Sequence, residues 1–327
     1  MVNEMTFMTT LTDPVIIGCT QLKNRLVMAP MAFGLANERG EVTEKLVKHY
    51  VDRCDGPGLV IIEATSVSSV GRMFERQLSL ADGRNVQALG GLVDQLHQRG
   101  VKVAIQLAHA GGTASSKLIG TRPLAPSSIT IPGGGEEAPL RMSLDDIDET
   151  VTDFVDAAER VWEAGFDAVE LHGAHGYLLN QFLSPLTNHR KDQYGGSIAN
   201  RMRISARIVE GIKRRNPNQT LLYRLGAEDI AAGGLSLNQG VEAAMLLEKM
   251  GVDAIDVSGG VGLSLKWIDG QSKVGFLVPQ ARAVKAAVKV PVIGVGGIKT
   301  LEEADAFIRM GSADLIAVGR AILKNPK

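Results

Sequence analysis

Two histidines and a tyrosine lie close together in the middle of the chain, directly after a short apolar run at residues 166–171. The run predicts a buried strand that ends at His172, and His175 and Tyr177 follow at once. A tyrosine with an ordinary pKa of about 10 keeps a proton at neutral pH, which it can donate as a general acid. The two imidazoles can bind a metal, donate hydrogen bonds to a substrate oxygen, or serve as structural polar groups. We predict no metal site, because no Asp or Cys supplies an obvious third ligand.

Glycine-rich turns near the end of the chain form a second candidate site. Gly296 and Gly297 follow one apolar run, and Gly319 and Arg320 follow the next. Open backbone N–H groups in such turns bind anions, and an arginine adds a bidentate contact to phosphate. Tight turns also favour glycine for conformational reasons alone. Two such turns at consecutive strand ends favour a phosphate site, which by itself fits many enzymes.

Two further polar residues lie at the ends of apolar runs. Gln106 offers an amide with both a donor and an acceptor, which suits the polar edge of a bound ligand. Arg224 carries a permanent positive charge that can stabilise negative charge on a bound group. The alternative for Arg224 is an internal salt bridge, for which Glu170 and Asp256 are the candidate partners.

Strand-like apolar runs alternate with helical patterns along most of the chain. The predicted strands are residues 25–28, 59–62, 101–107, 166–171, 220–225, 254–257, 291–295 and 313–318. The predicted helices are residues 43–54, 85–98, 144–164, 197–215, 238–250, 280–288 and 301–310. This alternation specifies a parallel sheet, and eight strands close a (β/α)8 barrel, the TIM barrel. An open doubly wound sheet is the competing fold, but it usually has fewer strands and a glycine-rich turn after the first one.

We therefore predict one α/β barrel domain over residues 1–327. The Gly/Pro/Ser-rich region 111–142 lacks strong periodicity, so we expect a functional excursion or small elements of its own there. Ser197 is the predicted N-cap of the helix that follows it. The chain ends at Lys327, shortly after Arg320, so the eighth helix is expected to be short or truncated.

Composition narrows the class of protein. The chain is 45% hydrophobic and has a net charge of −1, which gives no general attraction to nucleic acid or to anionic membranes. No apolar run approaches the ~20 residues that span a bilayer. The two cysteines, Cys19 and Cys54, have no metal-ligand spacing, and the N-terminus lacks a signal-peptide pattern. We expect a cytoplasmic protein with a small-molecule substrate, and leave open whether identical chains associate.

The segment that begins at His172 resembles the old yellow enzyme family of ene-reductases, which use flavin mononucleotide (FMN). It contains His-x-x-His-Gly-Tyr-Leu, then Gln-Phe-Leu-Ser-Pro, Asn-His-Arg, and Asp-x-Tyr-Gly-Gly-Ser-x-x-Asn-Arg. The resemblance extends over about thirty residues and is far more specific than any short pattern. It implies an FMN cofactor and NADH or NADPH as the electron donor.

The resemblance also implies roles for individual residues. His172 and His175 are expected to bind the carbonyl oxygen of an electron-poor alkene, and Tyr177 to protonate the carbon next to that carbonyl while flavin N5 gives hydride to the β-carbon. The expected cofactor-binding residues are Pro30, Met31, Ala32, Ala64, Gln106, Arg224, Gly296, Gly297, Gly319 and Arg320.

Ala32 departs from the family pattern. Many relatives carry Thr or Cys after Met-Ala-Pro-Met, and that side chain donates a hydrogen bond to the flavin. Alanine has no donor, so the reduced flavin loses a stabilising contact. We therefore expect a lower flavin potential than in relatives that have the donor.

The function predicted from the sequence is FMN-dependent NAD(P)H oxidation coupled to reduction of the activated C=C bond of α,β-unsaturated carbonyl compounds. One alternative is a flavin-free barrel lyase or isomerase that acts on a phosphorylated substrate and uses the histidines as acid and base. That alternative gives no role to Gln106 and Arg224 together. The other alternative is a non-catalytic barrel, which would not need His172, His175 and Tyr177 together.

Overall fold

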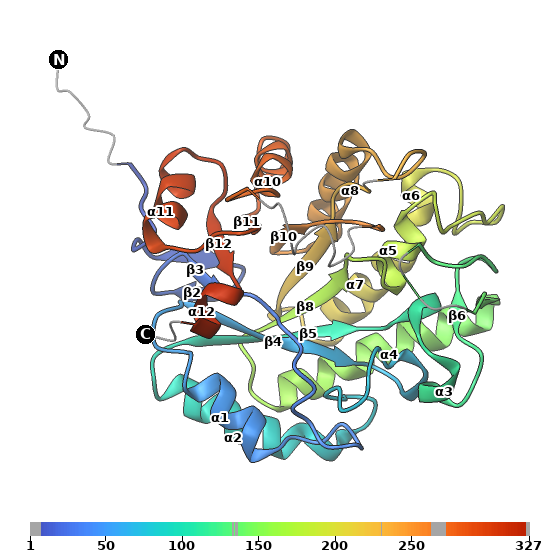
Figure 1. Cartoon of the computed structure of the whole chain (residues 1–327), viewed down its shortest axis with the longest axis horizontal. Helices are drawn as coiled ribbons and strands as arrows, with labels where there is room; N and C mark the ends of the chain where they lie inside the picture. The colour runs from blue at the N-terminus through green and yellow to red at the C-terminus, as the bar shows by residue number, and fades with distance from the viewer. Residues whose placement is uncertain (1–7, 133, 135–136, 230, 263–272, 325–327) are drawn as a thin grey trace.

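A closed barrel of parallel strands forms the centre of the molecule (Figure 1). The structure is a computed structural model that describes residues 8–132, 134, 137–229, 231–262 and 273–324. In chain order the barrel strands are β3 (Leu26–Met28), β4 (Leu59–Ser66), β5 (Lys102–Ala108), β8 (Ala168–Gly173), β9 (Thr220–Gly226), β10 (Ala254–Ser258), β11 (Val292–Gly294) and β12 (Leu315–Val318). Strand β12 pairs with β3 and closes the ring. All eight predicted strands are present, and the predicted (β/α)8 barrel is confirmed.

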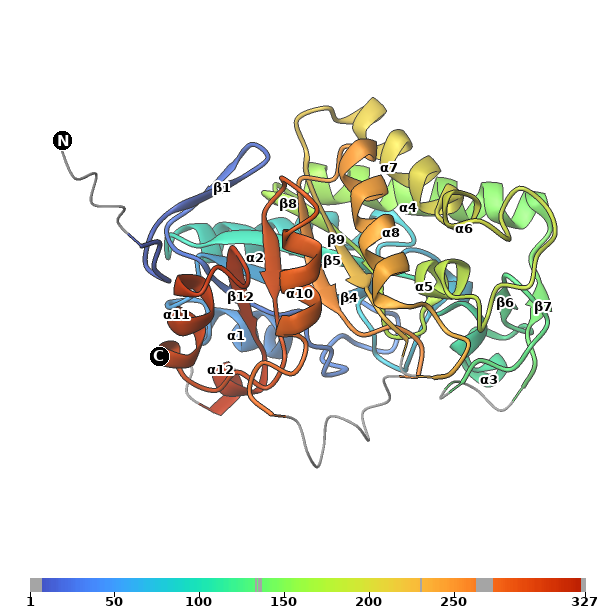
Figure 2. The same cartoon turned by 90° about the horizontal axis from the view of Figure 1, so that it is seen from above.

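Helices surround the strands, as Figures 1 and 2 show. They are α1 (Glu44–Val51), α2 (Val86–His97), α4 (Leu144–Glu163), α5 (Leu178–Leu183), α6 (Ile198–Arg201), α7 (Arg203–Arg215), α8 (Leu237–Met250), α10 (Val278–Lys285), α11 (Leu301–Arg309) and α12 (Arg320–Lys324). Ser143, Ser236 and Thr300 begin α4, α8 and α11 with capping boxes, which satisfy the first free N–H groups of these helices.

The barrel interior changes from apolar to polar along the strands. Small and branched side chains such as Leu59, Ala104 and Ala168 fill the end where the strands begin. The antiparallel hairpin of β1 (Val15–Ile17) and β2 (Thr20–Leu22) adds Ile17 and Leu22 to the same cluster. Side chains alternate along a strand, so Glu170 and His172, two and four positions after Ala168 in β8, also point inward. In β8 these residues are polar, and so the polar groups gather at the C-terminal end of the barrel.

The predicted excursion lies between β5 and α4. It contains a short helix, α3 (Ser116–Ile119), and the paired strands β6 (Leu124–Ala125) and β7 (Leu140–Arg141). Both views place it beside α5 (Figures 1 and 2). The region therefore has small elements of its own and lies next to the segment that follows β8.

The helix predicted at residues 197–215 is divided into α6 and α7. Ser197 caps α6, as expected, by accepting a hydrogen bond from the N–H of Asn200. Met202 then interrupts the helix with φ −84° and ψ −5°. The preceding residue, Arg201, is buried, and its guanidinium bonds to the carbonyl oxygen of Leu183 in the neighbouring segment. This tertiary contact, which periodicity cannot reveal, accompanies the break.

The last described helix, α12, spans Arg320–Lys324. Among the described residues, no helix is both long and apolar enough to cross a membrane. The described residues also contain no group of three His, Cys, Asp or Glu side chains placed to hold a metal ion.

Two helical glycines allow a matched test of how closely α8 packs on the barrel. A Cβ on Gly240 would lie 1.9 Å from the carbonyl oxygen of Ala227, whereas a Cβ on Gly91 of α2 would meet nothing within 4 Å. We expect Gly240→Ala to lower the free energy of unfolding by about 1–3 kcal/mol through overpacking. We expect Gly91→Ala to raise it by about 0.4–1 kcal/mol, because alanine restricts the unfolded chain. Urea unfolding of both variants measures the difference, and equal destabilisation would argue against the close approach as the cause.

Candidate active site at the C-terminal end of the barrel

His172, His175 and Tyr177 form one cluster at the end of β8. The ring centroid of His172 lies 5.1 Å from that of His175 and 5.0 Å from that of Tyr177, in both cases with an edge-to-face arrangement. His172 is the second-last residue of β8 and points into the barrel, whereas His175 and Tyr177 lie in the turn before α5. The structure thus brings together the three residues predicted to carry the chemistry.

Each imidazole is held through one nitrogen. The Nδ1 atom of His172 accepts a hydrogen bond from the N–H of Ala174 at 3.4 Å, so the ring proton of a neutral His172 is on Nε2. The Nε2 atom of His175 lies 2.7 Å from the Oγ atom of Ser258, at the end of β10. The other ring nitrogens are Nε2 of His172 and Nδ1 of His175. Neither bonds to a described residue, and neither is enclosed by protein atoms. They are therefore open to a ligand.

Side chains of α5 fix the turn that carries His175 and Tyr177. Asn180 Oδ1 accepts a hydrogen bond from the N–H of Gly176 at 2.8 Å, and Gln181 Nε2 donates to the carbonyl oxygen of the same residue at 2.7 Å. His175 itself has φ +61°, a conformation that costs a non-glycine residue energy. Its N–H bonds to the carbonyl oxygen of Gly259 at 3.0 Å, which ties the turn to the end of β10.

Burial sets the protonation state of the three side chains. It lowers the pKa of His175 to about 3, with the positive charge of Arg224 adding to the shift. Burial also places the pKa of His172 well below its usual range, and His175 and Arg224 act in the same direction. It raises the pKa of Tyr177 above its usual value. At neutral pH the site therefore holds two neutral imidazoles and a protonated phenol.

A layer of polar side chains lies inside the barrel beside His172. Glu170 is fully buried and accepts a hydrogen bond from Gln106 Nε2 at 2.7 Å. Arg224 is 6% exposed, and its Nε atom lies 3.4 Å from a carboxyl oxygen of Asp256, which is fully buried. The internal salt bridge considered from the sequence is thus present, with Asp256 as the partner. It engages only the Nε side, and the terminal nitrogens of Arg224 bond to no described residue and are not enclosed.

The predicted phosphate site lies where β11 and β12 end. Gly296 and Gly297 adopt φ values of +125° and +67°, which residues with a side chain rarely adopt. A Cβ on Gly319 would lie 2.9 Å from the sulfur of Met31, so glycine lets the segments after β3 and β12 approach each other. Arg320 is the first residue of α12. The two glycine turns and Met31 therefore gather at one edge of the barrel mouth.

The remaining predicted cofactor residues lie on the same face of the barrel. Pro30 and Ala32 follow β3, with Ala32 exposed, and Ala64 lies in β4 with 7% of its surface exposed. A β-bulge between Ile62 and Thr65 changes the register of β4 at this point. Such bulges re-aim side chains next to active sites.

These features are compatible with bound FMN. The mouth combines two glycine turns, at Gly296 and Gly297 and at Gly319, with open polar atoms on Gln106 and Arg224. Gln106 Oε1 bonds to no described residue and is not enclosed. The phosphate group of FMN matches the glycine turns, and its polar heterocycle matches the amide of Gln106. The negative charge of the reduced flavin matches Arg224. The residues present thus fit the cofactor on chemical grounds.

Sequence reasoning missed two elements of the site. Ser258 directly follows the strand predicted at residues 254–257, and nothing in its local sequence indicates that its hydroxyl faces His175. Glu170 was considered only as a partner of Arg224. Its spacing of two from His172 in a buried strand was an available signal that both side chains point inward.

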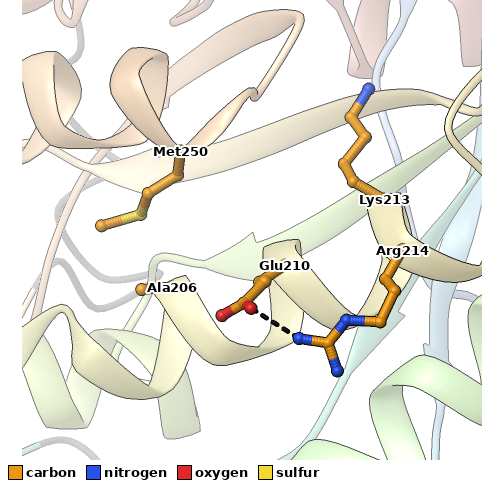
Figure 3. Close-up of a pocket in the computed structure, with 5 residues that line it drawn as sticks. All are labelled: Ala206, Glu210, Lys213, Arg214 and Met250. Carbon is orange, nitrogen blue, oxygen red and sulfur yellow. Dashed lines mark hydrogen bonds and ion pairs between the residues drawn. The ribbon is translucent and has the colours of Figure 1, made fainter.

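A separate hollow lies on the outer helices (Figure 3). It is lined by Ala206, Glu210, Lys213, Arg214 and Met250, and Glu210 and Arg214 form an ion pair between successive turns of α7. Met250 ends α8, just before β10 begins, so this hollow is at the opposite end of the barrel from the histidines.

Comparison with known proteins identifies the family of the chain. Residues 10–327 match the family model described as NADH:flavin oxidoreductase / NADH oxidase family. The chain is 41% identical to an NADPH dehydrogenase of Listeria monocytogenes serotype 4b over 307 residues, which is 93% of this chain and 88% of the relative. It is 38% identical to the NADH oxidase of Thermoanaerobacter brockii over 95% of this chain, but it spans only 48% of that relative.

Solved structures agree with the same assignment. An old yellow enzyme homologue from Zymomonas mobilis superposes with a TM-score of 0.86 at 28% identity, over 98% of this chain and 91% of that one. Morphinone reductase superposes with a TM-score of 0.83 at 28% identity, over 97% of this chain and 87% of that one. The resemblance stated from the sequence is confirmed. The expected enzyme class, an oxidoreductase, and the expected cofactors, FMN with NADH or NADPH, are those of this family. The chain belongs to the NADH:flavin oxidoreductase / NADH oxidase family, which includes the old yellow enzymes.

Proposed function

We propose that this chain reduces the electron-poor C=C bond of α,β-unsaturated carbonyl compounds, with FMN as its redox cofactor and NADH or NADPH as the electron donor. The proposal retains the expectations of a cytoplasmic location and of a small-molecule substrate. The observation that carries it is the cluster of His172, His175 and Tyr177, whose open polar atoms share one end of the barrel.

The two imidazoles act on the carbonyl oxygen of the substrate. Addition of hydride to the β-carbon moves negative charge onto that oxygen, and N–H donors stabilise it there more than in the ground state. His172 carries its proton on Nε2, the open nitrogen. When the Ser258 hydroxyl donates to His175 Nε2, the proton of His175 is on Nδ1, which is also open. Ser258 thus acts as a positioning residue for the second donor.

Tyr177 completes the reaction by giving its proton to the carbon next to the carbonyl. Burial raises its pKa, so the phenol stays protonated across the neutral range and a proton is available. Its ring packs against His172, which places proton donor and oxygen-binding group on the same side of the site.

The cofactor is assigned to the residues at the mouth of the barrel. Gly296, Gly297, Gly319 and Arg320 would hold its phosphate, and Gln106 and Arg224 the polar edge of its ring. Pro30, Met31, Ala32 and Ala64 would line the ring. When bound, FMN supplies the two-electron chemistry by accepting hydride from the nicotinamide and passing it to the substrate.

The electrostatics of the histidines weigh against the flavin-free lyase or isomerase. General acid–base catalysis is most efficient when the catalytic pKa lies near the working pH. Burial holds the pKa of His175 at about 3 and that of His172 well below its usual range. Neutral imidazoles that do not titrate near pH 7 suit fixed hydrogen-bond donors better than a proton shuttle.

The visible absorption spectrum of the purified protein tests the proposed function directly. We expect flavin bands that bleach when NADH or NADPH is added without oxygen and return when an enone such as cyclohexenone is added. The preferred nicotinamide is identified by the faster bleaching. A colourless protein that FMN cannot reconstitute would reject the proposal in favour of a phosphate-binding lyase or isomerase.

Replacing Tyr177 by phenylalanine separates the two half-reactions. We expect Tyr177→Phe to slow enone reduction by about 10²- to 10⁴-fold, the usual contribution of a positioned general acid. Bleaching of the flavin by the nicotinamide should change little, because that step needs no proton from the phenol. Stopped-flow absorbance measures both rates. Equal slowing of both steps would instead indicate a general structural role for the tyrosine.

Ala32 allows a test of the missing hydrogen bond. We expect Ala32→Thr to raise the potential of bound FMN by roughly 20–30 mV, equivalent to one net hydrogen bond of about 1–1.4 kcal/mol. Ala32→Val is the matched control, because valine has the shape of threonine without its hydroxyl. Dye-coupled titration gives the potentials, and equal shifts in both variants would assign the effect to bulk.

A further inference from the structure

The buried carboxyl groups of Glu170 and Asp256 lack hydrogen-bond donors. Glu170 Oε1 accepts from Gln106, but Glu170 Oε2 and both carboxyl oxygens of Asp256 are enclosed without a hydrogen bond. Arg224 Nε, at 3.4 Å from Asp256 Oδ2, forms an ion pair with Asp256 but no hydrogen bond. Enclosed acceptors without donors cost free energy, and native interiors rarely leave them so.

The two carboxyl groups interact directly with each other. Each is fully buried, and their side chains lie within hydrogen-bonding reach. Two carboxylates so placed would repel strongly in a water-free interior, whereas a proton on one of them donates a hydrogen bond to the other. One proton thus removes the repulsion and supplies a missing donor in a single step.

We propose that Glu170 and Asp256 share one proton, which leaves the cluster of Glu170, Asp256 and Arg224 without net charge and the terminal nitrogens of Arg224 available to the cofactor. The shared proton is a property of the barrel interior alone. The part that concerns the cofactor rests on the proposed function.

Among the described residues, the strands around the pair contribute no further charge. From β8, His172 faces the cluster as a neutral imidazole, and His175 above it is also neutral. From β5 comes the uncharged amide of Gln106. Interior side chains of β3, β11 and β12 are apolar, such as Val27, Ile293 and Ala317. Glu63 of β4 is a separate buried carboxyl that bonds to Tyr50.

The direction of titration follows from burial. Burial, followed by the charge of Asp256, raises the pKa of Glu170 to about 8, and Arg224 and Gln106 oppose the shift. Burial raises the pKa of Asp256 as well. The pair therefore keeps its proton at neutral pH and loses it as the pH rises through about 8. Loss of the proton adds one negative charge beneath the cofactor site.

Infrared spectroscopy of the holoenzyme tests the shared proton. A protonated buried carboxyl gives a carbonyl band distinct from carboxylate bands, and the band shifts in D2O. The measurement uses a Glu63→Gln background, because burial raises the pKa of Glu63 to about 7 and would add a band of its own. In this background we expect a carbonyl band from the Glu170–Asp256 pair at neutral pH. The band should disappear as the pH rises and the pair loses its proton.

Two variants distinguish sharing from simple burial. Glu170→Gln and Asp256→Asn should each abolish the band, because Arg224 then ionises the single carboxyl that is left. A band that survives Asp256→Asn would overturn the proposal, since Glu170 would then hold its proton through burial alone. Absence of the band in the Glu63→Gln protein would overturn it too. Either variant alone suffices should the other fail to fold.

The potential of bound FMN tests the link to the cofactor. Below about pH 8 we expect the flavin potential of the wild-type protein and that of Glu170→Gln to fall in parallel as the pH rises. Above about pH 8 the potential of the wild type should fall more steeply, because only the wild type gains a negative charge beside the cofactor site. Parallel lines throughout would contradict that link. Neither readout needs an enone, so a protein that fails to reduce enones but shows the band rejects the proposed function and leaves the shared proton intact.

Discussion

A permanent positive charge inside the barrel is the constraint on which the site depends. Arg224 is almost fully buried, and a buried charge must be matched by opposite charge or by hydrogen bonds. Asp256 supplies the match on one side of the guanidinium, and the other side stays open. The same charge helps to keep His172 and His175 neutral, since a second cation so close would be repelled. Arg224 thus adds to the effect of burial on the two histidines.

Hydrogen bonds to the protein fix the orientation of the two neutral imidazole rings. The backbone of Ala174 and the hydroxyl of Ser258 each bond to one ring nitrogen, which turns the other nitrogen toward open space. The turn between them is held by Asn180 and Gln181 in a backbone conformation that His175 would not adopt unaided. The local strain is thus offset by hydrogen bonds from α5, and the donors need little rearrangement when a ligand arrives.

Much of this arrangement could be predicted from the sequence, because barrel topology converts strand ends into neighbours. Gln106, His172 and Arg224 each end an apolar run, and the predicted fold alone was enough to expect them at one mouth. What could not be predicted depends on side chains that meet across strands. The bond of Ser258 to His175 and the contact of Glu170 with Asp256 join residues more than eighty positions apart. Likewise, the break at Met202 accompanies a bond from Arg201 to Leu183 that periodicity does not encode.

The pairing of β12 with β3 also determines when the site can form during folding. Ile316 lies opposite Leu26 in that pair, so the ring closes between segments almost three hundred positions apart. Gly319 and Met31 touch at the same junction. Contacts this distant in sequence form slowly, because a long loop of chain must first be ordered. A nascent chain therefore cannot complete the cofactor site proposed at this junction until its last barrel strand has been synthesised and has docked, and a flavin bound there would stabilise only the closed barrel.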